Sequence, residues 1–123
     1  MKVLIVDDEI LNRRLVRRLI EEKTTFKVVG EASNGFEAVA AVRVLRPDVV
    51  VMDVEMPELN GIEATRFIRQ NYPHVQVLAF TSAADDKSRI AMNEAGAIGY
   101  ILKGERDQLV YTLRAAQGRV VDR

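Results

Sequence analysis

The sequence predicts an α/β fold in which five parallel strands form one doubly wound sheet with helices on both faces. Short runs of β-branched and other apolar residues alternate with longer stretches of helical period along all 123 residues. Strict alternation favours parallel strands, because each crossover to a neighbouring parallel strand is made through a covering helix. The run VVVM at 49–52 contains no polar residue, which is typical of a strand buried on both faces.

The predicted strands are short apolar runs rich in valine, isoleucine and phenylalanine, which favour extended backbone. In chain order they are KVLIV (2–6), FKVVGEA (26–32), DVVVM (48–52), VQVLAF (75–80) and IGYIL (98–102). Polar residues follow each of them, so the end of every strand is marked in the sequence.

The predicted helices occupy the segments between and after these strands, at 10–23, 35–46, 61–71, 86–95 and 106–117. In the first, Leu11, Leu15 and Leu19 recur at every fourth position and predict the buried face. Its arginines predict a solvated, charged outer face: Arg13, Arg14, Arg17 and Arg18. Proline, asparagine or glycine marks the ends of the later helices: Pro47, Asn71 with Pro73, Gly96 and Gly118.

Composition narrows the classes of function. The chain has 48% hydrophobic residues, 18 basic and 18 acidic residues, and no cysteine. The hydrophobic content suits one compact domain, and the balanced charge predicts neither direct nucleic-acid binding nor a membrane partner. Without cysteine there are no disulfides, thiolate metal sites or cysteine nucleophiles. No apolar run approaches the roughly 18 residues of a spanning helix, and MKVLIV leads into acids rather than a signal sequence, so we expect a cytoplasmic protein.

The candidate functional residues lie where the predicted strands end. In doubly wound sheets, ligands bind at the carboxyl ends of the strands. Asp7 and Asp8 follow the first strand, Asp53 the third, Thr81 the fourth and Lys103 the fifth. In the strand order 2-1-3-4-5, the first and third strands are neighbours, so their three acids meet at one edge while Thr81 and Lys103 flank them.

Three carboxylates in close proximity either raise a pKa or recruit a cation. A site that offers only oxygen ligands indicates a hard ion, and magnesium fits best because it accepts one or two carboxylates and often completes its shell with phosphate oxygens. Asp53 could then attack phosphorus to form an acyl phosphate. Lys103 would offer a point charge to the phosphoryl oxygens and Thr81 a hydroxyl donor.

At these positions the chain resembles the receiver domain of bacterial two-component response regulators, with the flavodoxin-like strand order. The resemblance covers residues 2 to 118 and rests on four segments in family-like order and spacing: VDDE, MDVEMPELNG, FTSA and GYILK. The stretch AGAIGYILK is most similar to receivers that precede a helix-turn-helix DNA-binding domain. The resemblance thus implies a receiver domain at 1–118, with 119–123 as a tail or the start of a linker.

The resemblance also implies a role for each site residue. Asp53 would be the phosphoacceptor, Asp8 the direct magnesium ligand with Asp7 assisting, and the main-chain carbonyl of Glu55 a further ligand. The residues that contact the phosphoryl group or report its presence would be Thr81, Lys103 and Tyr100. Tyr100 remains open to a second interpretation, as an ordinary packed aromatic residue.

The resemblance implies a signalling function rather than an enzyme acting on a separate substrate. The phosphoryl group would come from a sensor histidine kinase or a phosphotransfer protein. Phosphorylation would then change the outer surface, with homodimerisation as one consequence and control of transcription as the output. That output would act through a domain absent from this chain or through a partner.

One residue departs from the family pattern. Gly104 follows Lys103, where many receivers have a cis-linked proline. We expect a trans bond here, since a cis bond before a non-proline residue costs about 2.5–4 kcal/mol. The segment from Lys103 to Leu109 is also slightly shorter than in common relatives.

Other classes fit the sequence less well. A phosphatase of the haloacid dehalogenase type would carry a second aspartate where Glu55 stands, together with a cap insertion that this chain lacks. A flavin-binding module would place a phosphate loop after the first strand, where Asp7, Asp8 and Glu9 would repel it. A nucleotide-binding loop is not indicated either, because no G-x-G-x-x-G occurs and GYILKGER has Glu105 where the Walker motif requires lysine. An interaction module that is never phosphorylated would not need the complete set of acids, hydroxyl and ammonium.

Overall fold

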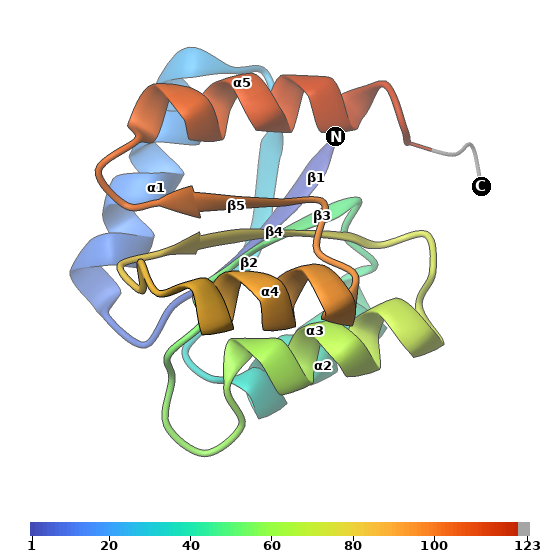
Figure 1. Cartoon of the computed structure of the whole chain (residues 1–123). Coiled ribbons are helices and arrows are strands. Elements are labelled where there is room, and N and C mark those ends of the chain that lie inside the picture. Colours follow the sequence, from blue (N-terminus) through green and yellow to red (C-terminus); the bar gives the residue numbers. More distant parts are fainter. Residues whose placement is uncertain (121–123) are drawn as a thin grey trace.

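The computed structural model describes residues 1–120, which form five strands and five helices. The strands form one parallel sheet in the order β2-β1-β3-β4-β5, as predicted (Figure 1). Their bounds are β1 Lys2–Val6, β2 Lys27–Ala32, β3 Val49–Met52, β4 Gln76–Thr81 and β5 Gly99–Leu102. The helices are α1 Ile10–Lys23, α2 Gly35–Leu45, α3 Gly61–Asn71, α4 Asp86–Ala95 and α5 Arg106–Gln117. Every boundary lies within one residue of its predicted position.

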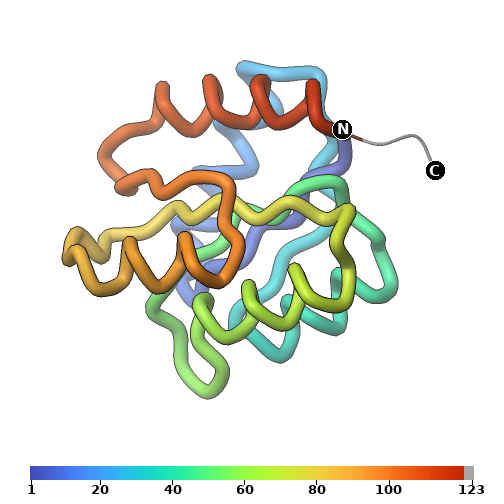
Figure 2. The backbone as a smooth tube through the Cα atoms, turned by 45° about the vertical axis from the view of Figure 1, so that its right-hand side comes forward, coloured from blue at the N-terminus to red at the C-terminus, as the bar shows by residue number. Residues whose placement is uncertain are grey.

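Helices cover both faces of the sheet, and the sheet separates two layers of core between itself and the helices (Figures 1 and 2). On one face, α1 and α5 bury Val16, Ile20, Leu109 and Leu113 against the strands. On the other face, α2, α3 and α4 contribute apolar residues that include Val42, Ile68 and Met92. Strand β3 is buried along its whole length between these layers, as the VVVM run predicted.

The predicted buried face of the first helix is wrong. Leu11 is 73% exposed and Leu15 is also exposed, whereas Val16 and Ile20 are the buried residues of α1. Because each helical residue turns the side chain by about 100°, Leu11 lies about 180° from Ile20. A repeat of every fourth residue therefore drifts around the helix, and among the three leucines Leu19 packs against the core as a partly buried residue.

Asparagine and aspartate side chains begin three of the helices. Asn34 accepts a hydrogen bond from the Glu37 amide, and Asp85 accepts one from the Ser88 amide. Asn60 accepts from the amides of Ile62 and Glu63, which fixes the start of α3 just beyond the loop that follows β3. These contacts satisfy amides that have no partner in the first helical turn. None of the helices within residues 1–120 combines the length and the apolar character needed to cross a lipid bilayer.

Candidate functional site

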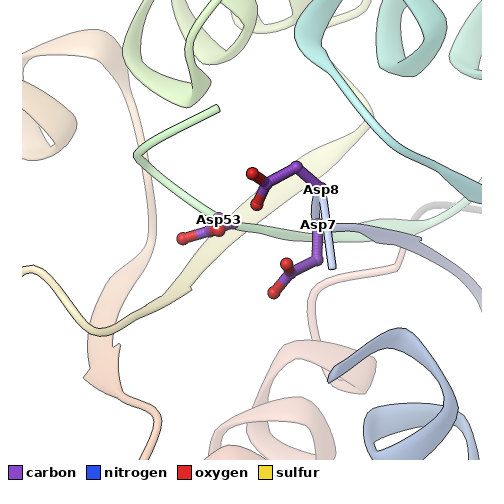
Figure 3. A group of neighbouring side chains, drawn as sticks. All are labelled: Asp7, Asp8 and Asp53. Carbon is purple, nitrogen blue, oxygen red and sulfur yellow. The ribbon is translucent and has the colours of Figure 1, made fainter. Parts of the chain in front are cut away.

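Three aspartates meet where β1 and β3 end. The Asp53 amide donates to the Val6 carbonyl at 2.9 Å, and the Asp7 amide donates to the Ala32 carbonyl at 3.0 Å, so the sheet ladder holds both residues in place. Each of Asp7, Asp8 and Asp53 has a carboxylate oxygen within 4.8 Å of one from each of the others. Figure 3 shows the three carboxylates turned toward the same side of the strand ends. The predicted convergence of the acids is confirmed.

The three acids differ in exposure. Asp7 and Asp53 are buried, at 4% and 5% exposed, whereas Asp8 is exposed. Burial, followed by the negative charge of Asp7, raises the pKa of Asp53 from 3.8 to about 6. The ammonium of Lys103, the Thr81 hydroxyl and the Val54 amide act in the opposite direction but do not cancel the rise in this pKa.

Lys103 joins the two buried acids. Its Nζ lies 2.7 Å from an Asp7 carboxylate oxygen and 3.5 Å from an Asp53 carboxylate oxygen. Partial burial lowers the pKa of Lys103, but hydrogen bonds and attraction from Asp7 and Asp53 outweigh it and hold the pKa above its usual value. The Lys103 amide donates to the Thr81 carbonyl, which fixes the end of β5 beside β4. Every peptide bond within residues 1–120 is trans, so the expected trans bond to Gly104 is confirmed.

A small polar cavity of about 300 Å³ opens beside Asp53. Its lining residues come from the ends of β1, β3, β4 and β5: Asp8, Glu9, Asp53, Glu55, Thr81, Ser82, Ala83 and Lys103. The structure therefore brings five sequence-derived candidates to one cavity, with Asp7 adjacent through its contact with Lys103. Ser82 and Ala83 also line the cavity; both belong to the FTSA segment, but the sequence reasoning gave neither of them a role.

Tyr100 does not line this cavity, but it contacts the loop that follows Thr81. Its hydroxyl donates to the Ala83 carbonyl at 2.6 Å, and the Ala83 amide donates to the Thr81 hydroxyl at 3.2 Å. Its ring packs against the core on the α2, α3 and α4 face, and the Arg89 guanidinium lies 4.7 Å from the ring centroid. Two hydrogen bonds thus connect Tyr100 to Thr81 through Ala83.

Arg13 supports the acid cluster and was missed by the sequence reasoning. Its Nη1 donates to the Asp7 main-chain carbonyl at 2.6 Å, and its Nε lies 3.1 Å from a Glu31 carboxylate oxygen. The side chain is 15% exposed, so the interpretation of this arginine as part of a solvated outer face is wrong. The available signal was its position six residues after Asp7, on the first turns of a helix that starts near that acid.

The donor set fits a small divalent cation. The three carboxylates offer oxygen ligands, and hard cations such as Mg²⁺ prefer oxygen ligands. Two of the acids are buried, while Asp8 and Asp53 line the open cavity, where a bound ion could keep water molecules in its shell. The residues present therefore fit magnesium, with Lys103 as a second source of positive charge.

Comparisons with known proteins agree with this geometry. A family model described as the response regulator receiver domain matches residues 3–114. The chain is 41% identical to the response regulator GacA of Pseudomonas syringae, over 85% of this chain and 49% of that protein. It is also 41% identical to a protein-glutamate methylesterase/protein-glutamine glutaminase of Idiomarina loihiensis, over 98% of this chain and 32% of that protein. The chain thus spans half or less of the length of these relatives.

The fold also matches solved structures of this kind. The crystal structure of the response regulator domain of Thermotoga maritima CheB superposes with a TM-score of 0.89 at 33% sequence identity. That match covers 100% of this chain and 98% of the other. With the family model matching most of the chain, and with the acids, hydroxyl and ammonium gathered at the strand ends, this chain belongs to the response regulator receiver domain family of two-component signalling.

Proposed function

We propose that this receiver domain accepts a phosphoryl group on Asp53. The observation that carries the proposal is a buried carboxylate that lines an open cavity and has a second acid and an ammonium beside it. An aspartate on the open surface would not hold a phosphoryl group away from bulk water. It would also lack the neighbouring acid, hydroxyl and ammonium that the strand ends supply here. The arrangement therefore suits acceptance of an anionic group that arrives from outside.

The transfer uses Asp53 as the nucleophile. A carboxylate oxygen of Asp53 attacks phosphorus, a new P–O bond forms, and the bond to the donor's leaving group breaks. With a phosphohistidine donor the leaving group is an imidazole, which takes up a proton. Burial raises the pKa of Asp53 to about 6, so this carboxyl is mostly ionised and ready to attack at neutral pH.

The remaining site residues stabilise the charge of the transferred group. Lys103 would pair with the phosphoryl oxygens, and Thr81 would donate its hydroxyl to one of them. Asp7, Asp8, Asp53 and the Glu55 main-chain carbonyl would hold magnesium. When bound, the ion shields negative charge between the carboxylates and the phosphoryl group.

Phosphorylation then changes the outer surface through Thr81 and Tyr100. Drawing the Thr81 hydroxyl toward the phosphoryl group would break its contact with the Ala83 amide, and the Ala83 carbonyl is the acceptor of the Tyr100 hydroxyl. The surface formed by α4, β5 and α5 would rearrange in response. A phosphoryl group shifts this equilibrium only by its differential affinity for the two arrangements.

The proposed partners are a phosphoryl donor and a second copy of the receiver. A sensor histidine kinase or phosphotransfer protein supplies the phosphoryl group in the cytoplasm, and phosphorylation favours a homodimer. Residues 1–118 act as the receiver and 119–123 as a tail or linker; residues 121–123 lie outside the described residues. Regulation of transcription is the proposed output, supported by a 40% identical relative of Brevibacillus brevis named transcriptional regulatory protein DegU.

Binding of beryllofluoride, a phosphoryl mimic, tests this site. We expect amide NMR shifts around the cavity only when Mg²⁺ and beryllofluoride are both present, and no such shifts in Asp53→Asn. Asp8→Ala should fold normally, because removal of one clustered acid relieves repulsion, but should lose the magnesium-dependent binding of beryllofluoride. Equal shifts in Asp53→Asn would overturn the assignment of the phosphoacceptor, and unchanged binding in Asp8→Ala would make Asp8 a purely structural residue.

A further inference from the structure

Exposed apolar side chains gather in a groove between α2 and α3, away from the acid cavity. Phe36 is 60% exposed, Val44 78% and Phe67 46%. Together with Leu59 they line a groove of about 990 Å³, which is separate from the acid cavity of about 300 Å³. Figures 1 and 2 show the two helices side by side on the same face of the sheet. Exposed apolar side chains grouped in this way mark interaction surfaces, whereas single ones need no explanation.

The charged residues of the groove are mostly positive. Arg43 and Arg66 both line it, and within residues 1–120 neither guanidinium forms an ion pair. Glu63 is the one acid among the lining residues and likewise has no ion pair in that part of the chain. Two unpaired guanidinium groups beside an apolar surface complement a partner that presents apolar and acidic side chains together.

The dimensions of the groove suit a single helix. Its walls, α2 and α3, have 11 residues each, which corresponds to about 16 Å, or three helical turns. Ten residues line it, whereas a stable interface between two folded subunits takes roughly 20 to 30 residues from each side. The groove is therefore too small to be the interface with a second copy of this chain. It is large enough for one face of an amphipathic helix that packs between α2 and α3.

We propose that this groove binds an amphipathic helix of another protein. The bound helix carries large apolar side chains at i, i+3 or i+4, and i+7, which pack on Phe36, Val44 and Phe67. Acidic side chains on its flank face Arg43 and Arg66. The groove shares no lining residue with the acid cavity, so the helix should bind the unphosphorylated protein.

The test uses a pair of synthetic helical peptides of about four turns that share one leucine face. One carries glutamates beside that face, and its matched control carries lysines at the same positions. We expect the acidic peptide to shift the amide NMR signals of residues 35–45 and 61–71, and to bind about tenfold more tightly than the lysine peptide. Reversing both charges in Arg43→Glu with Arg66→Glu should invert that preference.

Variants of exposed residues separate the groove from general stickiness. Val44→Ser and Phe67→Ser should each weaken binding of the acidic peptide several-fold. Tyr111→Ser removes an equally exposed apolar side chain from α5, outside the groove, and should leave binding unchanged. No shift at millimolar peptide, equal binding of both peptides, or shifts outside α2 and α3 would overturn the proposal. So would concentration-dependent self-association through the same residues, which would make the occupant a second copy.

Discussion

Burial of Asp53 opposes folding at neutral pH. Its pKa is raised from 3.8 to about 6, so between these values the native state keeps a proton that the unfolded chain has released. Stability from this group is therefore present at low pH and falls as the pH rises through that window. We expect Asp53→Asn to be more stable than the wild type at pH 7 without magnesium, by on the order of 1 to 3 kcal/mol.

Urea unfolding in a chelator, at pH 4 and pH 7, checks this sign. The stability gap between Asp53→Asn and the wild type should shrink toward pH 4. Asp8→Asn is the matched control, since Asp8 is exposed and should gain less. Equal stability of Asp53→Asn and the wild type at pH 7 would mean that Lys103 fully compensates the buried charge.

Arg13 is expected to stabilise the chain through its contact with the Asp7 carbonyl. Removing a charged donor from a mostly buried carbonyl costs about 1 to 3 kcal/mol. Arg13→Ala should lose that much free energy of unfolding, while Arg14→Ala, one residue away and exposed, should change it by less than about 0.5 kcal/mol. Thermal or urea unfolding of both variants measures the difference, and equal losses would show that Arg13 adds nothing beyond surface charge.

At the scale of elements, the junction between β3 and α3 requires glycine. A Cβ at Gly61 would collide with the Asp53 carbonyl oxygen, and the Gly61 amide donates to the Val54 carbonyl at 2.8 Å. Gly61→Ala should cost about 1 to 3 kcal/mol, since α3 must move away from the strand end. Gly104→Ala is the control, because a Cβ there meets nothing within 4 Å. Similar unfolding free energies for the two variants would contradict the close approach.

The loop between β4 and α4 is the element expected to transmit the signal. Thr81→Ala removes the hydroxyl that accepts from the Ala83 amide, so the variant should still take up a phosphoryl group but respond weakly at residues 86–112. Thr81→Ser keeps a hydroxyl and should restore the response. Amide NMR shifts with and without beryllofluoride measure it. Full-size shifts in Thr81→Ala would remove Thr81 from the coupling and leave Lys103 as the connection to Tyr100.

Element boundaries were predictable from the sequence, but the orientation of α1 was not. Polar residues and turn formers follow each apolar run, so both the strand ends and the gathering of Asp7, Asp8 and Asp53 follow from local pattern and parallel topology. In α1, apolar residues occupy several sides, and packing against β1 and α5 decides that Val16 and Ile20 face inward. Leu11 and Leu15 were therefore assigned to the wrong face.

For the whole molecule, contacts between distant segments were the part that the sequence could not supply. The pairing of Lys103 with Asp7 at 2.7 Å, closer than with Asp53 at 3.5 Å, depends on how β5 lies beside the rest of the sheet edge. The groove between α2 and α3 depends on two helices that are separated in sequence by β3 and its loop. Neither leaves a periodic signal, since both arise only when the sheet brings these elements together.

Asp53 is proposed to accept a phosphoryl group with the help of magnesium and its neighbouring acids. Intact mass after incubation with Mg²⁺ and acetyl phosphate tests it most directly. We expect one phosphoryl group to be added to the wild type, on Asp53, and none to be added to Asp53→Asn or without magnesium. Undiminished labelling of Asp53→Asn would show that Asp53 is not the phosphoacceptor.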